Sequence, residues 1–535
     1  MTATIQTTDI IGAGTAFTFA ANGDSLFVLE GVTLASTADV TIQGNSNSLH
    51  VDGTIISGDD TSIRLFGYSS GSTISIGETG VVRSGADAQG GAFIDASNVD
   101  LVSSGQLHND GQIVSPRAIG VMMADASNYL TNTGTIIGAT GVYMGFDTVG
   151  EFGWGAGYDT LVNSGFISGT LQVYTEATNS ERHGVYSTGD GTHITNEAGG
   201  VIAGVGNLGT GITIGSGTSI GGGNGSVVIN HGTITADEYW AIDFFPMRGG
   251  DRAELFNTGI VSGERGSFRG NQTGGQVTNS GTMIGSVLQS DHANSQFRNA
   301  GVVWGDVFTG AGDDLYRAFG GGFVSGKVNG GSGHDVLIGA REDDTMIGAN
   351  GQDTIRGKLG DDRLFGGAGS DDLMGGAGDD MLNGGRAADK MAGGIGDDIL
   401  AGEAGNDRIR GNAGDDALYG GDGNDTLIGG TGADTLSGGA GADIFVFLST
   451  EDSPAGGGAF DQIVDFTSGE DKSDLSALGG RPLAFDTPVG DTGVVTWRRV
   501  DDGHVMLEAD IDGDGVNDFQ VLLTTFGIMN SDVIL

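Results

Sequence analysis

From Gly330 to Val446 the chain repeats one nine-residue pattern of apolar and polar positions through thirteen consecutive units. The first position is always Gly and the fourth is Gly in eleven units, with Glu342 and Ala387 as the exceptions. The eighth position is always apolar: Leu337, Met346, Ile355, Leu364, Leu373, Leu382, Met391, Leu400, Ile409, Leu418, Leu427, Leu436 and Phe445. The sixth is always Asp: Asp335, Asp344, Asp353, Asp362, Asp371, Asp380, Asp389, Asp398, Asp407, Asp416, Asp425, Asp434 and Asp443. One apolar position per unit predicts a short strand with one inward side chain after every turn.

Two units make a coil of eighteen residues, and successive coils of a β-solenoid stack about 4.8 Å apart. Glycine accepts positive φ, so Gly-Gly-x-Gly forms a tight turn whose carbonyls can point inward. Aspartates of alternate units therefore stand in columns, one column on each side of a parallel β-roll. Asp314, ahead of the regular run, is a further candidate of the same kind.

Two bare carboxylates at that spacing repel by about 3.5 kcal/mol at an effective dielectric constant near 20. This is a sizeable part of a domain's stability of about 5–15 kcal/mol, so the columns close only around cations. Carboxylate and carbonyl oxygens fit a hard ion, and Ca²⁺ accepts irregular geometry better than Mg²⁺. We therefore predict that these aspartates are Ca²⁺ ligands.

The nonapeptide resembles that of the RTX (repeats-in-toxin) proteins, which implies a calcium-bound β-roll. A disordered Gly/Asp-rich tail is the alternative, but the invariant apolar position argues against it, because disorder needs no buried stripe. Weak calcium rungs are expected at Glu342 and Ala387, where the turn glycine is missing.

A looser repeat precedes residue 305. Phrases of the type Asn-x-Gly followed by alternating apolar residues begin at Asn109, Asn132, Asn163, Asn196, Asn230, Asn257, Asn279 and Asn299, 20–34 residues apart. Residues 51–58 and 78–85 are degraded copies. Each phrase predicts a turn entering a strand, with asparagine amides that can form a ladder from coil to coil. The region resembles the parallel β-helices of bacterial surface proteins.

The composition of the chain argues against some classes of binding partner. Lys and Arg total 23 against 69 Asp and Glu, a net charge of −46, which argues against binding nucleic acid or an anionic membrane through a basic surface. No apolar run approaches the length of a membrane span. Cysteine is absent, and no positive residue precedes Arg64, so the N-terminus lacks the basic region of a Sec signal peptide.

The C-terminal segments ADIFVF (442–447), FDQIVDFTSGEDKSDLSAL (460–478) and DFQVLLTTFGIMNSDVIL (518–535) resemble the distal end of serralysin-type RTX proteins. That resemblance implies an uncleaved C-terminal signal for type I secretion. Within this tail, Asp510, Asp512, Asp514 and Asp518 have EF-hand-like spacing, but position twelve is Val521 instead of Glu. A single calcium loop and a simple Asp/Gly hairpin turn both remain open.

RTX rolls often accompany enzymes, so the presence or absence of catalytic motifs bears on the function of this chain. The eight histidines contain no HExxH, and the GxSxG matches at 67–71 and 217–221 lie in Gly/Ser/Thr-rich text without a following helix. Alginate epimerases join a β-helix to RTX modules, but their Asp-Pro-His stretch is absent. Polar clusters occur at Arg182 with His183 and at Asp243 with Arg248 and Asp251, for which solvated loops are the favoured interpretation.

Aromatic insertions at 145–160 and 237–252 contain Trp154 and Trp240, and Trp304 lies nearer the repeats. Such loops can bind sugars, although packing on their own coil is the favoured interpretation.

The sequence thus predicts an all-β protein with a parallel β-helix (1–305), a calcium β-roll (306–446) and a C-terminal cap with a secretion signal (447–535). The expected function is non-enzymatic: a secreted, calcium-binding structural protein that self-assembles as a surface layer, filament or matrix, as a homo-oligomer or lattice. A surface glycan or lipopolysaccharide is a possible partner. The alternatives are a carbohydrate-active β-helix enzyme of epimerase or lyase type, or an adhesin.

Overall fold

The computed structural model describes residues 3–6, 10–12, 17–19, 22, 24–36, 40–43, 46–57, 63–66, 72–84, 97–101, 105–115, 119–124, 128–145, 159–170, 182–187, 192–205, 209–214, 225–244, 253–270, 274–289, 292–456, 460–478, 483–485 and 493–535. The chain divides into two compact units, Met1–Val307 and Phe308–Leu535. The boundaries predicted at residues 305 and 446 stay predictions.

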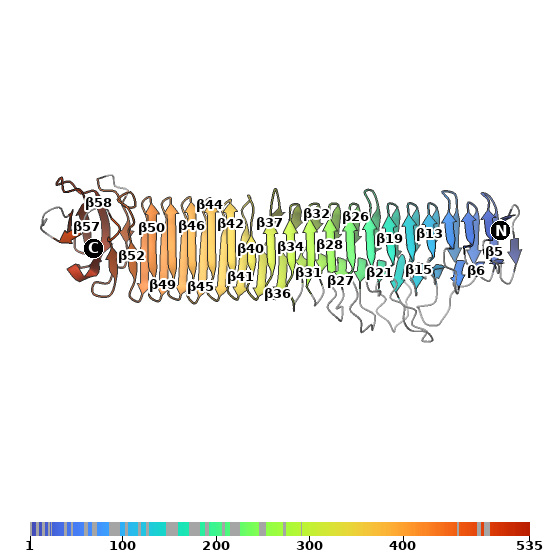
Figure 1. The fold of residues 1–535 in the computed structure, drawn as a ribbon, viewed down its shortest axis with the longest axis horizontal. Helices are drawn as coiled ribbons and strands as arrows, with labels where there is room; N and C mark the ends of the chain where they lie inside the picture. The colour runs from blue at the N-terminus through green and yellow to red at the C-terminus, as the bar shows by residue number, and fades with distance from the viewer. Residues whose placement is uncertain are drawn as a thin grey trace. The chain divides into compact units, whose positions relative to one another are not determined.

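The first unit is a β-helix with three parallel sheets, and each coil contributes one strand to each sheet (Figure 1). Sheet A contains β1 (Ala3–Gln6), β4 (Ser25–Val28), β7 (Ser48–Val51), β10 (Thr73–Ile76), β13 (Gln106–Asn109), β16 (Tyr129–Asn132), β19 (Thr160–Asn163), β22 (His193–Asn196), β25 (Val227–Asn230), β28 (Ala253–Asn257), β31 (Gly275–Asn279) and β34 (Gln296–Asn299). Sheet B contains β2 (Ile10–Gly12), β5 (Thr33–Ser36), β8 (Thr54–Ser57), β11 (Val81–Ser84), β14 (Gln112–Val114), β17 (Thr135–Gly138), β20 (Phe166–Thr170), β23 (Val201–Val205), β26 (Thr233–Ala236), β29 (Ile260–Gly263), β32 (Thr282–Ile284) and β35 (Val302–Trp304). Sheet C contains β3 (Phe17–Phe19), β6 (Val40–Gln43), β9 (Ile63–Phe66), β12 (Ser97–Leu101), β15 (Ile119–Ala124), β18 (Val142–Gly145), β21 (Arg182–Ser187), β24 (Gly209–Ile214), β27 (Trp240–Phe244), β30 (Gly266–Arg269) and β33 (Val287–Leu288).

Each of the eight predicted asparagines ends a strand of sheet A, and the x-Gly that follows turns the chain into sheet B. The register is fixed from coil to coil: Asn109 pairs with Asn132, and Asn132 with Asn163. A Cβ on Gly134 would collide with the backbone carbonyl of Gly111 in the neighbouring coil, which explains why this turn position is glycine. In the two earlier coils Val51 and Ile76 occupy the asparagine position, as expected for degraded copies.

The second unit contains a two-sheet roll. Roll sheet 1 contains β37 (Leu315–Ala318), β40 (Val336–Ile338), β42 (Thr354–Leu359), β44 (Asp372–Ala377), β46 (Lys390–Ile395), β48 (Arg408–Ala413), β50 (Thr426–Thr431), β52 (Ile444–Val446), β54 (Lys472–Asp474) and β59 (Val533–Ile534). Roll sheet 2 contains β39 (Val328–Ser332), β41 (Thr345–Asn350), β43 (Arg363–Ala368), β45 (Met381–Arg386), β47 (Ile399–Ala404), β49 (Ala417–Asp422), β51 (Thr435–Ala440), β53 (Gln462–Ile463) and β58 (Phe519–Thr524). The remaining elements are β36 (Val307–Ala311), β38 (Phe323–Val324), β55 (Leu483–Phe485), β56 (Gly493–Asp501), β57 (His504–Asp510) and the 3₁₀ turn η1 (Asn530–Asp532).

Pairing in the roll is parallel with a shift of eighteen residues, so Ile355 lies beside Leu373 and Leu364 beside Leu382. All thirteen eighth-position side chains are buried, which gives one apolar layer per half coil. At the C-terminal end the pairing changes: β57 is antiparallel to both β56 and β58, and β58 is parallel to β53. The predicted all-β fold of a parallel β-helix followed by a β-roll is confirmed.

Candidate calcium site

The sixth-position aspartates are buried although they belong to polar turns. The exposed fraction of each is 4% or less from Asp335 to Asp443, and Asp314 is 2% exposed. An acidic side chain is almost never this buried unless it is paired. Their environment therefore decides what the turns can bind.

Each repeat aspartate except Asp344 uses one carboxylate oxygen to hold the neighbouring coil. The backbone N–H of Asp362 donates to Oδ1 of Asp380 at 2.8 Å, and the N–H of Asp380 donates to Oδ1 of Asp398 at 2.8 Å. These bonds form two files. The first file is Asp344, Asp362, Asp380, Asp398, Asp416 and Asp434, and the second is Asp314, Asp335, Asp353, Asp371, Asp389, Asp407, Asp425 and Asp443.

The other oxygen, Oδ2, is buried without a hydrogen-bond partner in twelve of the thirteen repeat aspartates. The exception is Asp344, whose Oδ2 accepts the N–H of Ala340 at 3.0 Å. An unsatisfied buried carboxylate oxygen is costly, and here it recurs at nearly every coil on both sides of the roll. The files are therefore a set of buried acceptors that lack donors.

The first-position glycine forms the wall against which Oδ2 lies. A Cβ on Gly357 would collide with Oδ2 of Asp362, and one on Gly375 with Oδ2 of Asp380; the same holds in all thirteen units. The carbonyl of the glycine one coil further on lies beside the same point, as Gly375 does for Gly357. Glycine thus lets each orphan oxygen lie against the turn backbone, with carbonyl oxygens as neighbours.

Burial is the main cause of the unusual acidity of these groups. Desolvation raises the pKa of Asp362 and Asp416 to about 8, and that of Asp353, Asp389 and Asp398 to about 7. Neighbouring carboxylates raise the pKa further, whereas the bond from the adjacent backbone N–H lowers it. A bound cation would counter both the desolvation and the repulsion.

The residues present fit Ca²⁺. The donor set is made of carboxylate and carbonyl oxygens only, which suits a hard cation with flexible coordination. We expect the sixth-position aspartates to hold the ion, with turn carbonyls completing its shell. Their individual roles as ligands stay predictions.

The two turns that lack the fourth-position glycine differ from the others. Ala387 adopts φ +75°, which is the glycine conformation, so this residue is strained. In the unit with Glu342, the N–H of Ala340 donates to Oδ2 of Asp344, whereas the same oxygen has no partner in the other units. Positive φ also occurs at Ala349, Lys358, Glu403 and Asn412, so strain does not set the Ala387 turn apart, and the weaker rungs stay a prediction.

The structure adds two aspartates that the repeat pattern missed. The N–H of Asp434 donates to Oδ1 of Asp461 at 2.9 Å, and the N–H of Asp443 donates to Oδ1 of Asp471 at 3.1 Å. The Oδ2 of Asp461 is buried without a partner, and burial raises the pKa of this carboxyl to about 9. The signal was Asp-Gln-Ile at 461–463, which repeats the Asp-x-apolar half of the unit without its glycines.

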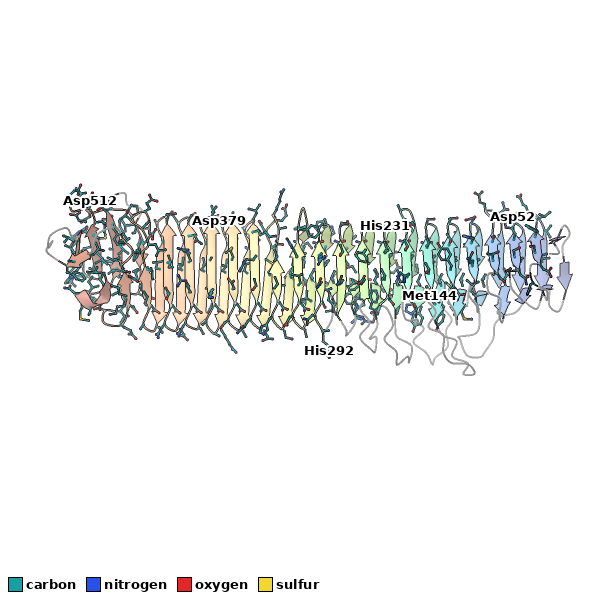
Figure 2. All side chains as sticks on the ribbon, viewed as in Figure 1. Asp52, Met144, His231, His292, Asp379 and Asp512 are labelled. Carbon is teal, nitrogen blue, oxygen red and sulfur yellow. The ribbon has the colours of Figure 1, made fainter. Side chains whose placement is uncertain are left out.

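The EF-hand-like segment is the hairpin between β57 and β58 (Asp512 is labelled in Figure 2). Carboxylate oxygens of Asp510, Asp512 and Asp514 lie within 4.8 Å of one another. Asp518 instead accepts the N–H groups of Ile511 and Asp512, at 2.8 and 3.3 Å. This segment therefore forms a hairpin turn. Calcium binding by Asp510, Asp512, Asp514 and Asp518 stays a prediction.

Both polar clusters of the β-helix are partly described, and the interpretation as solvated loops is wrong for His183 and Asp243, which are buried in strands β21 and β27. His183 Nδ1 lies 2.9 Å from the Thr213 hydroxyl, and buried Asp243 forms a bidentate ion pair with Arg269, one coil further on. Trp240 is buried and packs over Gly266, whereas Trp304 is 53% exposed. Trp154, Arg248, Asp251, the two GxSxG matches and the side chain of Arg182 lie outside the described residues.

The comparisons with known proteins identify the repeat region. The model of the RTX calcium-binding nonapeptide repeat family, which spans four copies, matches residues 329–364, 356–391, 365–400, 392–427 and 419–449. These residues are RTX calcium-binding repeats, and Ca²⁺ is their cofactor. Both predictions are confirmed.

Solved structures with similarity include two subunits of the Azotobacter vinelandii mannuronan C5-epimerase. AlgE6R3 is 30% identical over 30% of this chain and 80% of its own, with a TM-score of 0.19. AlgE6R2 is 32% identical over 27% and 91%, with a TM-score of 0.22. The extracellular lipase LipA from Serratia marcescens is 19% identical over 42% and 45%, with a TM-score of 0.20. No curated protein matches the chain. Among the described residues, no helix has the length and apolar character needed to cross a membrane.

Proposed function

We propose that this is a secreted, non-enzymatic structural protein that folds on binding calcium outside the cell and then assembles into a surface layer, filament or matrix. The observation that carries the proposal is the pair of buried aspartate files, whose orphan oxygens recur over the whole length of the roll. So many costly groups give no benefit at a single catalytic centre, but they make the folding of the roll conditional on an ion.

The difference in calcium concentration between the cytoplasm and the exterior controls whether the roll folds. Extracellular calcium modules work with dissociation constants of about 10⁻⁴–10⁻³ M, so such a roll stays open in the cytoplasm and closes outside. An open chain suits export through a type I secretion system, which the C-terminal resemblance to serralysin-type proteins implies. Secretion and its route belong to the proposal.

Assembly is supported by the solenoid architecture. A stack of parallel β-coils has edge strands, and the backbone groups of an edge strand can pair with a strand from another molecule.

Light scattering and circular dichroism, recorded on the same samples during a calcium titration, test the proposal. We expect assembly to follow folding over the same range of calcium concentration, because calcium lowers the net charge of −46 while it orders the roll. A protein that folds fully yet stays monomeric at high concentration would exclude the assembly and favour a soluble adhesin that binds a surface glycan.

A carbohydrate-active enzyme is the second candidate, and the His183–Thr213 and Asp243–Arg269 pairs of sheet C favour it. Product formation from alginate and pectin, with casein as a protease control, separates the two candidates. Turnover that His183→Ala abolishes, and that the exposed control His231→Ala preserves, would place the enzyme first. We expect no turnover.

A further inference from the structure

The two edges of the roll differ in their exposed charges. The first edge consists of the turns that run from roll sheet 1 to roll sheet 2 and hold the file from Asp344 to Asp434. The second edge consists of the opposite turns, which hold the file from Asp335 to Asp443. The difference lies at the fifth position of the nonapeptide, next to each buried aspartate.

On the first edge the fifth position is an exposed aspartate in five successive coils: Asp343, Asp361, Asp379, Asp397 and Asp415. On the second edge it is never acidic: His334, Gln352, Ser370, Ala388, Asn406, Asn424 and Ala442. Figure 2 labels Asp379, one of the exposed set, at the edge of the roll strands.

The exposed carboxylates are held in place. Oδ1 of Asp361 accepts the N–H of Asp379 at 3.0 Å, and Oδ1 of Asp379 accepts the N–H of Asp397 at 2.9 Å. Asn406 and Asn424 make the same bond on the second edge, at 2.8 and 2.9 Å. The two edges therefore share one geometry, and they differ in charge.

The charge difference holds for the turns as a whole. Positions two to five of the first edge carry Arg341 and Lys358 against Glu342 and the five aspartates, a net charge of −4. The same positions of the second edge carry Arg386 against Glu403 and Asp422, a net charge of −1 with His334 neutral.

We propose that the two edges of the roll bind calcium in sequence, with the first edge filling at the lower calcium concentration because its exposed aspartates add charge beside the buried ligands. This inference rests on the proposed calcium-dependent folding. The buried, unpartnered Oδ2 atoms place an acceptor on each edge, so the exposed file is what distinguishes the edges.

The size of the effect follows from Coulomb's law. One more carboxylate about 6 Å from a divalent ion raises its affinity about tenfold at the dielectric constant of water, and less at physiological salt. The first edge would thus order first and give the chain a half-folded stage in which one side is closed.

Two pairs of isosteric substitutions test the order in the full chain. Asp379→Asn with Asp397→Asn removes charge from the first edge, and Asn406→Asp with Asn424→Asp adds it to the second. Each replacement keeps the Oδ1 acceptor of the turn. Hydrogen exchange resolved to single turns, measured against free calcium, reports the midpoint of each edge separately.

In the wild type we expect the amides of Asp379 and Asp397 to become protected at about tenfold lower calcium than those of Asn424 and Ala442, which donate to Asn406 and Asn424. The first pair of substitutions should raise the first midpoint only, and the second pair should lower the second midpoint only. One common midpoint in the wild type, or variants that shift both edges equally, would overturn the proposal. Absence of protection at any calcium concentration would instead contradict calcium-dependent folding itself.

Discussion

Both units of this chain stack polar side chains from coil to coil, asparagine in the β-helix and aspartate in the roll. These side chains differ only in an amide in place of a carboxylate. In the β-helix, buried asparagines stack coil by coil, and Nδ2 of each donates to Oδ1 of the next at 2.7–2.9 Å. In the roll, buried aspartates stack at the same kind of corner and leave Oδ2 orphaned. An amide is both donor and acceptor, so its ladder is complete without help. A carboxylate only accepts, so its ladder needs an ion.

The two kinds of ladder affect the stability of the two units differently. The neutral ladder needs no cation, whereas the acidic files make the roll conditional on calcium. The asparagine ladder is itself unsatisfied at one point: Oδ1 of Asn109 lacks a donor because Ile76 precedes it. One missing donor costs about 1–3 kcal/mol, whereas the roll has such a gap in almost every coil.

Removal of calcium should have the largest effect. We expect a chelator to unfold the roll and leave the β-helix folded, because the stacked carboxylates among the described residues belong to the roll. Limited proteolysis should then degrade residues after about 308 and spare those before, and millimolar calcium should restore protection. Fragments cut equally in both units would show that the comparison is wrong.

Asn196→Asp should break the neutral ladder. Asn196 accepts from Asn163 and donates to Asn230, both at 2.8 Å, so the carboxylate loses its donor and faces another acceptor. We expect a loss of about 3 kcal/mol in the unfolding free energy of the β-helix, measured by urea denaturation. Exposed Gln112→Glu makes the same amide-to-carboxylate change outside the ladder, is the control and should change it little. Equal effects would exclude a special role for the ladder.

The pH should act on the calcium-free roll in an unusual direction. Folded-state pKa values raised from about 4 to about 7 or 8, as at Asp389 and Asp416, mean that the folded roll binds more protons than the unfolded chain. Stability is then highest near pH 4 and is lost as the pH rises through 6 to 8. In chelator, circular dichroism should show more β-structure at pH 5 than at pH 8. The opposite order would refute the raised pKa values.

Ala387→Gly should give the smallest effect, a stabilisation of the calcium-loaded roll. Ala387 has φ +75°, and relief of this strain is worth about 1 kcal/mol. Ala392→Gly lies in strand β46, where glycine costs about 0.5–1 kcal/mol, and serves as the control of opposite sign. Thermal denaturation of the calcium-loaded protein measures both. A lower melting temperature for Ala387→Gly would show that the turn does not need glycine.

The roll could be predicted almost completely, because its turns and inward residues recur with one fixed period. The asparagine corner was also predictable, since Asn-x-Gly marks a strand end and a turn. Asp461 and Asp471 were not, because they continue the files after the glycine pattern has stopped. The pairing of His183 with Thr213 and of Asp243 with Arg269 could not be predicted either, because the numbers of residues between these partners follow no fixed period.

Hydrogen exchange of the full chain, compared in chelator and in millimolar calcium, tests the central claim most directly. The backbone N–H of Asp380, which donates to Asp398, should exchange rapidly in chelator and slowly in calcium. The N–H of Thr133, which donates to the carbonyl of Asn109 in the β-helix, should be protected equally in both. Equal protection of the roll amides with and without calcium would contradict the account.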